Sequence, residues 1–209
     1  MKVINLMLMS LDGEIASRSD ETNDERLQQG VSNPYDQNLV KEEIKQSEAV
    51  IIGAASVRAD AHLGPFKNFR GDYPTWFIYT TRGFDPSLAF WQQSANPRVL
   101  VSAGLLPRSS DKVGSLCYGT HPPGQFLLDH LRSKGVERVL LLGGGKVNQI
   151  FYGENLVDEL KLTIAPRFLG RGQTRVVNAP LPTPVQLELI SSLVKDSFIY
   201  SHYRIRREN

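Results

Sequence analysis

The feature that most constrains this chain is a short apolar strand that ends in three consecutive glycines. The run Val139–Leu142 is apolar at every position, as expected for a strand covered on both faces of a parallel sheet. Gly143, Gly144 and Gly145 follow at once, and the next segment, Lys146–Phe151, is compatible with a helix. Glycine lets the backbone turn sharply and lets another group approach the main chain closely. The sequence therefore predicts a strand, a tight glycine turn and a helix in direct succession.

A turn of this kind has two interpretations. The first N–H groups of the helix lack helical partners and point at whatever occupies the turn, which favours a phosphate group. In the alternative interpretation, the turn only connects strand and helix and binds nothing. The spaced glycines of a dinucleotide fingerprint are absent, and Lys146 is not followed by the Ser or Thr of a P-loop. The glycines alone leave both interpretations open.

A second junction of the same kind occurs earlier in the chain. The apolar run Ala49–Ile52 is followed by Gly53 and by a helix start that includes Ser56, whose hydroxyl can cap the helix or donate to a phosphate. If both strands belong to one parallel sheet, both junctions lie at the same edge, beyond the carboxyl ends of the strands. Two phosphate-binding turns at one edge suit a dinucleotide.

A polar pair follows a third predicted strand, Thr75–Tyr79. Thr81 and Arg82 come just after this strand. The planar guanidinium of arginine binds phosphate through paired N–H groups, which suits the 2′-phosphate of NADPH. The alternative is an arginine in an ordinary polar turn.

Several segments together resemble one known family. They are the glycine run, the segments Leu156–Leu160 and Ala165–Pro166, and the pair Gly170 and Gly172. These segments are similar to the reductase domain of riboflavin biosynthesis, the C-terminal half of the bifunctional deaminase–reductase. The resemblance implies a dihydrofolate-reductase-like α/β fold, with a mostly parallel central sheet flanked by helices and a C-terminal antiparallel hairpin. It also implies an NADPH-dependent reductase that acts on 5-amino-6-(5-phosphoribosylamino)uracil.

The resemblance further implies roles for individual residues. Asp60 is the first candidate for the catalytic proton donor and also faces the substrate, with Asp36 as the second candidate and Asp12 as the third. The cofactor-binding residues that it implies are Gly53, Ser56, Val57, Thr81, Arg82, Gly143, Gly144, Gly145, Lys146 and Val147.

On the substrate side, the segment Ser10–Ala16 resembles the opening motif of the family. This motif places Ser10 and Asp12 against the nicotinamide and the substrate, whereas an ordinary Asp-Gly turn is the alternative. Arg70 is the candidate for holding a substrate phosphate, with Lys67 as a rival. The predicted substrate-binding residues are Ser10, Asp12, Asp60 and Arg70.

The sequence departs from the family pattern at three places on the substrate side. Gly143 stands where the family has a Glu before two glycines, Leu6 stands where it has a Lys, and a Trp after the first loop is absent. Two alternatives therefore remain beside the pyrimidine reductase. One is a related reductase of a pterin, a folate or another small heterocycle, and the other is a non-catalytic NADP-binding protein.

The composition of the chain limits the number of domains and the kinds of partner, metal site and compartment that we expect. A chain of 209 residues with 41% hydrophobic content fits one domain over residues 1–209 that folds without a metal ion or a disulfide. Its 24 basic and 22 acidic residues argue against a nucleic-acid or membrane-surface binder. The single cysteine, Cys117, excludes an intrachain disulfide and the cysteine-based zinc site of a deaminase. With no signal-peptide layout and no apolar run of about 20 residues, we expect a cytoplasmic protein.

Two further segments carry predictions about motion and assembly. Residues Arg18–Gly30 are polar with little apolar periodicity, which predicts a mobile surface loop of the kind that often forms a lid. Ser32 or Asn33 is expected to cap the next helix. Near the C-terminus, Val185–Ile190 and Phe198–Ile205 alternate in polarity and predict a hairpin, which we expect to carry the contact of a homodimer.

Overall fold

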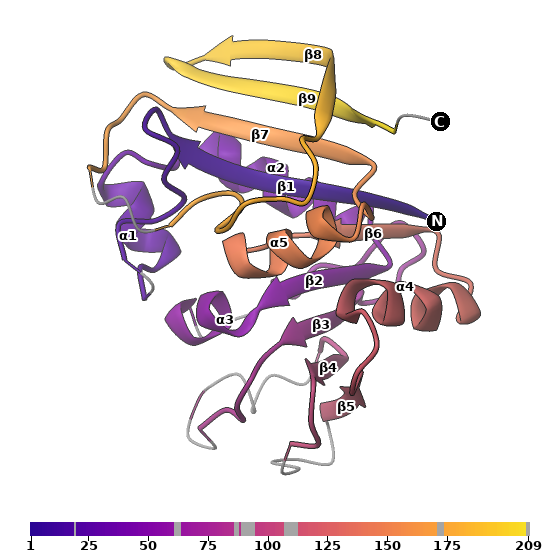
Figure 1. Ribbon diagram of the computed structural model, residues 1–209. Helices are drawn as coiled ribbons and strands as arrows, with labels where there is room; N and C mark the ends of the chain where they lie inside the picture. Colours follow the sequence, from indigo (N-terminus) through magenta and orange to yellow (C-terminus); the bar gives the residue numbers. More distant parts are fainter. Residues whose placement is uncertain are drawn as a thin grey trace.

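The structure is a computed structural model that describes residues 1–18, 20–60, 64–85, 88, 95–106, 113–170 and 174–207. Within these ranges the centre of the molecule is a nine-stranded sheet in the order β5-β4-β3-β2-β6-β1-β7-β9-β8 (Figure 1). The strands are β1 (Lys2–Ser10), β2 (Ala49–Gly53), β3 (Thr75–Tyr79), β4 (Arg98–Ser102), β5 (Val113–Cys117), β6 (Arg138–Leu141), β7 (Glu159–Ala165), β8 (Gln186–Lys195) and β9 (Phe198–Arg206). The helices are α1 (Asn23–Gln28), α2 (Pro34–Lys45), α3 (Ala54–Asp60), α4 (Pro123–Ser133) and α5 (Gly145–Gly153).

The sheet is parallel over most of its width and antiparallel at one end. Every pairing from β5 across to β7 is parallel, whereas β9 runs antiparallel to both β7 and β8. The N-terminal strand β1 lies between β6 and β7, so the two ends of the sequence are joined in one sheet. This topology confirms the predicted mostly parallel sheet with a C-terminal antiparallel hairpin.

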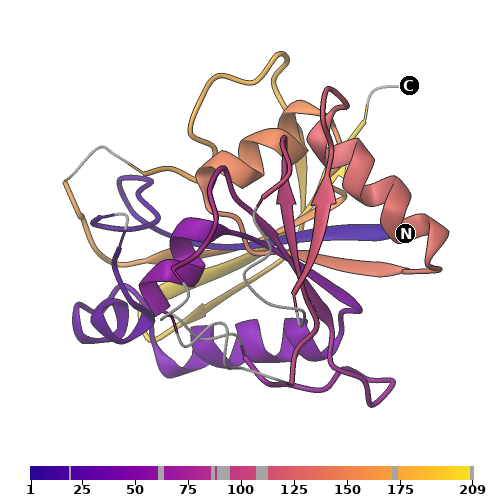
Figure 2. The same cartoon turned by 90° about the horizontal axis from the view of Figure 1, so that it is seen from below.

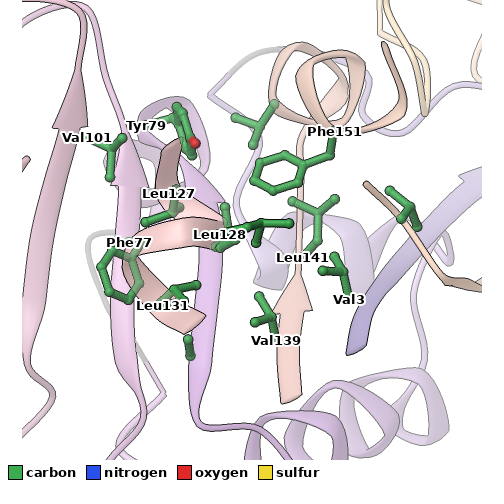
Figure 3. Packing of buried hydrophobic residues seen from close by; sticks show 14 of the residues in the cluster. Val3, Phe77, Tyr79, Val101, Leu127, Leu128, Leu131, Val139, Leu141 and Phe151 are labelled. Carbon is green, nitrogen blue, oxygen red and sulfur yellow. The ribbon is translucent and has the colours of Figure 1, made fainter. Parts of the chain in front are cut away.

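Helices cover both faces of the sheet. Figure 2 shows α4 and α5 on one side of the strands and α1, α2 and α3 on the other. The α4 and α5 face packs through a cluster that includes Phe77, Leu127, Leu141 and Phe151, the last of which is fully buried (Figure 3). The opposite face buries a second cluster around Ile78 and the first turns of α3. Two buried faces explain why the central strands are continuously apolar.

Local signals fix where α2 begins. The Asn33 side chain accepts a hydrogen bond from the Asp36 N–H at 2.8 Å, and Pro34 occupies the first helical turn. Asn33 is therefore the N-cap, one of the two residues that the sequence predicted, and Pro34 lacks the N–H that would otherwise be unpaired there.

The predicted loop at residues 18–30 contains a short helix. Thr22 and Glu25 form a reciprocal capping box at the start of α1, in which each side chain accepts from the other residue's backbone N–H. The sequence predicted a mobile surface loop here and did not reveal the helix, because six residues show too little apolar periodicity to be recognised. No helix in the described ranges is long and apolar enough to cross a membrane.

Candidate functional site

The two glycine junctions meet at the carboxyl edge of the sheet. β2 and β6 are parallel neighbours, and the pairing continues past their ends through two backbone hydrogen bonds. Leu142 donates to the Ile51 carbonyl at 2.8 Å, and Gly53 donates to the Gly143 carbonyl at 2.6 Å. The two junctions therefore lie at the same edge of the sheet, as predicted, and are hydrogen-bonded to each other.

Each glycine of the run has a different physical reason to be glycine. Gly143 has a φ of +75°, in the left-handed region that side chains rarely adopt. A Cβ on Gly145 would lie 2.2 Å from both the Arg175 carbonyl oxygen and Asn178 Oδ1, so the segment after β7 closes against this residue. Among the described residues, a Cβ on Gly144 would meet only the Ile15 side chain, at 3.4 Å. Within this part of the chain, Gly144 therefore leaves an open surface.

The first turn of α5 lies directly over this surface. Gly144 is its N-cap and supplies no side-chain hydrogen bond. Among the described residues, no acceptor is found for the backbone N–H groups of Gly145 and Lys146, and the Lys146 side chain is exposed. A nine-residue helix with free first-turn amides and an adjacent cation favours an anion at this point.

A buried network of polar side chains from β1 and α5 packs beside the glycine turn. The side chain of Asn5 donates to the Leu141 carbonyl at 2.8 Å and to Asn148 Oδ1 at 3.2 Å, and Tyr152 donates to Asn5 Oδ1 at 3.1 Å. Asn148 also donates to the Val176 carbonyl at 2.8 Å. Asn5 and Asn148 are fully buried, so this network fixes α5 against β1 and β6. Sequence reasoning missed it because its members lie far apart in the chain.

A cleft of about 170 Å³ opens beside the junctions. Its apolar lining includes Leu6 from the middle of β1, Ile52 near the end of β2 and Leu142 just after β6, and Gly144 also lines it. Asp60 lines the cleft from the last turn of α3. Its Oδ1 accepts a 2.8 Å hydrogen bond from the Asn23 N–H at the start of α1.

Further charged side chains line the cleft where α1 and α2 approach it. Glu21 is buried and pairs with Arg26, whose Nε lies 3.2 Å from Glu21 Oε2. Asp36 accepts a 3.0 Å hydrogen bond from Ser32 Oγ, and burial raises the pKa of its carboxyl. Sequence reasoning did not find Glu21 or Arg26; the Thr22–Glu25 capping pattern was the available signal that this segment is ordered.

The cofactor residues predicted around the junctions divide into two groups. Ser56 and Gly144 line the cleft, whereas Val57 and Val147 are 1% and 6% exposed and pack in the hydrophobic core. A Cβ on Gly53 would lie 3.2 Å from the Val147 side chain. The two valines therefore stabilise the junctions by packing in the core, and Val147 packs directly against Gly53.

Thr81 and Arg82 follow β3, the neighbour of β2, and so lie at the same edge of the sheet. Both are exposed. The turn is built by the buried Thr80, whose Oγ1 accepts from the Arg82 N–H at 3.3 Å and donates to the Arg82 carbonyl. Arg82 lines a groove together with Arg58, Gly83, Asp85 and Leu88.

The structure does not bring Ser10 and Asp12 to the cleft. Ser10 is fully buried, and its hydroxyl donates to Asp12. Asp12 accepts from the Leu169 N–H at 3.1 Å and from the Gly170 N–H at 2.7 Å. The hydrogen bonds from Ser10 and then Gly170 lower the Asp12 pKa to about 2. These hydrogen bonds tie two loops together, and substrate binding by Ser10 and Asp12 stays a prediction.

Arg70 also lies away from the predicted site. Its guanidinium pairs with Glu48 at 2.5 Å and with Glu137 at 3.3 Å. These acids immediately precede β2 and β6, so Arg70 is at the amino edge of the sheet, opposite the glycine junctions. This placement does not support the expectation that Arg70 holds a substrate phosphate. Its rival Lys67 lies over the Tyr73 ring at 5.5 Å.

The arrangement of strands matches solved structures. A pyrimidine reductase-like protein from Corynebacterium diphtheriae superposes with a TM-score of 0.80 at 16% identity, over 99% of this chain and 92% of that chain. A dihydrofolate reductase from Enterococcus faecalis, solved with NADP(H), matches with a TM-score of 0.60 at 13% identity, over 99% of this chain and 97% of that chain. The fold is therefore dihydrofolate-reductase-like.

Sequence comparison narrows this class to one family. A 2,5-diamino-6-ribosylamino-4(3H)-pyrimidinone 5′-phosphate reductase from Methanothermobacter thermautotrophicus is 25% identical over 178 residues, 81% of this chain and 79% of that protein. The family model described as the RibD C-terminal domain matches residues 1–197. The chain belongs to the RibD C-terminal domain family.

Proposed function

We propose that residues 1–209 form a single reductase domain that uses NADPH to reduce a phosphoribosylaminopyrimidine of riboflavin biosynthesis. The observation that carries the proposal is the pair of glycine junctions joined by the Gly53–Gly143 hydrogen bond, which open beside a cleft lined by Asp60. The family membership and the name of the archaeal relative support the substrate class.

The residues present fit a dinucleotide phosphate. The open surface at Gly144 and the free first-turn amides of α5 suit the diphosphate, with Lys146 as a nearby cation. We assign this group mainly to α5, because α3 has only seven residues. Arg82 and Thr81 are exposed at the end of β3, where they would bind the 2′-phosphate.

When bound, NADPH supplies the hydride for the reduction. The chain itself orients the reactants and excludes water, because Leu6, Ile52 and Leu142 form an apolar lining beside Gly144. We assign Asp60, which lines the cleft, a hydrogen bond to the substrate and the role of proton donor. The Asn23 N–H fixes one oxygen of this carboxylate.

The cleft also suggests which residues bind the rest of the substrate. Asp36 is held at the first turn of α2, where burial raises the pKa of its carboxyl, and we assign this side chain a hydrogen bond to the substrate. Arg26 is a basic side chain in the cleft lining, and we assign it the anionic end of the substrate in place of Arg70.

Turnover tests the proposal directly. The purified chain is mixed with NADPH and either 2,5-diamino-6-ribosylaminopyrimidinone 5′-phosphate or 5-amino-6-(5-phosphoribosylamino)uracil, and the loss of NADPH absorbance is followed. Oxidation of NADPH with either pyrimidine supports the proposal. Oxidation only with dihydrofolate or a dihydropterin would assign a related reductase instead, and tight binding of NADPH without oxidation by any of these would assign a non-catalytic binding protein.

We also propose that the enzyme is a homodimer assembled through β8. This ten-residue strand is at the edge of the sheet and exposes Leu189, Ile190, Leu193 and Val194, the last with 70% of its surface accessible. A long apolar edge strand pairs readily with another chain. A second copy is the simplest occupant, because a twofold axis brings the same strand against itself.

We place the enzyme in the cytoplasm. Cys117 is an exposed free thiol, which suits a reducing compartment.

A further inference from the structure

Arg58 is built into the turn that presents Arg82. It lies in the last turn of α3, and its Nη2 donates to Thr80 Oγ1 at 3.3 Å, to the Arg82 carbonyl at 3.4 Å and to the Gly83 carbonyl at 3.2 Å. The guanidinium also stacks over the Phe84 ring at 4.6 Å. The Arg58 side chain therefore holds the turn after β3 through three of its residues.

The two arginines face the same groove. Arg58 and Arg82 both line it, together with Gly83, Asp85 and Leu88. Burial lowers the pKa of Arg58, and the positive charge of Arg82 lowers it further. Two like charges at one groove repel each other, and an anion between them relieves this repulsion.

We propose that Arg58 is a positioning and specificity residue for the 2′-phosphate of NADPH, because it holds the Thr80–Gly83 turn and adds a second positive charge to the groove. The inference rests on the proposed use of NADPH and extends it by a residue that the sequence motifs did not assign. Arg82 contacts the phosphate from the exposed side of the turn, and Arg58 from the side of α3.

Asp85 makes the charge balance of the groove important. Asp85 is the acidic residue among the described residues that line the groove, and Arg58 and Arg82 are the basic ones. Loss of either arginine removes one positive charge from the groove, so the preference for the phosphorylated nucleotide falls.

The test compares Arg58→Met, Arg58→Lys and Arg82→Ala in nucleotide binding. Calorimetry gives the Kd values of NADPH and NADH, and competition gives those of 2′,5′-ADP and 5′-AMP, so no turnover is needed. We expect Arg58→Met to weaken NADPH and 2′,5′-ADP by about tenfold or more, as for loss of a charge-assisted contact, and to leave NADH and 5′-AMP within about twofold. Arg58→Lys keeps the charge but loses the fork geometry, so it falls between wild type and Arg58→Met.

Arg132→Met is the matched control, since Arg132 is an exposed arginine on α4 that pairs with Asp129. It should leave all four Kd values unchanged. Thermal melting establishes whether each variant is folded. If Arg58→Met does not fold, the Arg58→Lys variant decides. The supporting result is then a larger loss of affinity, relative to wild type, for 2′,5′-ADP than for 5′-AMP.

The Kd values distinguish a wrong role for Arg58 from a wrong proposed function. If Arg82→Ala removes the preference for NADPH while the Arg58 variants keep it, Arg58 has no role in specificity and the proposed function stands. Equal weakening of all four ligands by both Arg58 variants would make Arg58 a purely structural residue and also overturn the inference. If the wild-type protein binds neither NADPH nor NADH, the proposed function itself fails.

Discussion

The backbone N–H of Asn23 donates a 2.8 Å hydrogen bond to Asp60 Oδ1, which ties the first turn of α1 to the last turn of α3 across the mouth of the cleft. The acid that we assign to the reaction therefore also holds the segment that carries Arg26. A substitution at Asp60 must separate these two roles.

Asp60→Asn makes that separation. The amide oxygen still accepts from Asn23, whereas the carboxyl group is lost, so we expect kcat to fall roughly 100-fold or more while the melting temperature and the NADPH Kd stay nearly unchanged. Steady-state kinetics, melting and calorimetry measure the three quantities. Asp129→Asn on α4 is the control for the change of charge. Undiminished turnover by Asp60→Asn would exclude Asp60 as the proton donor.

Gly144 and Gly145 provide a matched pair of neighbours. Gly144→Val places its side chain into the open surface beside Ile15, so we expect loss of NADPH binding with a small change in melting temperature. Gly145→Ala forces a Cβ within 2.2 Å of Arg175 and Asn178, so we expect destabilisation of about 1–3 kcal/mol or more, as for other overpacked sites. Normal NADPH binding by Gly144→Val would mean that the turn only connects β6 to α5.

Asp12 makes a pH-dependent contribution to stability. Its folded pKa of about 2 lies below the ordinary value of 3.8, chiefly because of the Ser10 hydrogen bond and next that of Gly170. The stabilisation is therefore present above about pH 4 and is lost as the pH falls toward 2. We expect Asp12→Asn to unfold at lower urea concentration than wild type at pH 7, and this difference to shrink between pH 4 and pH 2. A constant difference over that range would contradict the assignment.

The β8 edge predicts the assembly state. Val194→Lys places a charge on the most exposed apolar residue of this strand, and we expect it to shift the protein from dimer to monomer in sedimentation at micromolar concentration. Gln37→Lys, on the exposed side of α2, adds the same charge away from the edge and should remain dimeric. If both variants sediment as the wild type does, β8 is not the dimer contact.

The fold was largely predictable because its signals are local. The continuous apolar runs that became β2, β3 and β6, the Asn33 cap and the glycine turn are each contained in a few residues. The prediction that both glycine junctions lie at the same edge of the sheet followed from the parallel direction of the strands.

The positions of two predicted substrate-binding residues, Asp12 and Arg70, depend on partners far away in the sequence. Asp12 is tied to Gly170, 158 residues later, and Arg70 is tied to Glu137, 67 residues later. No local pattern reveals such contacts. Arg58 was missed for a different reason, since its role depends on how α3 packs beside the turn after β3.

A crystal structure of the protein with NADPH tests most directly whether the joined glycine junctions bind the diphosphate. We expect the diphosphate on the amides of Gly145 and Lys146, the nicotinamide in the cleft beside Leu142, and the 2′-phosphate at Arg82. A diphosphate bound elsewhere, with the surface over Gly144 left empty, would contradict it.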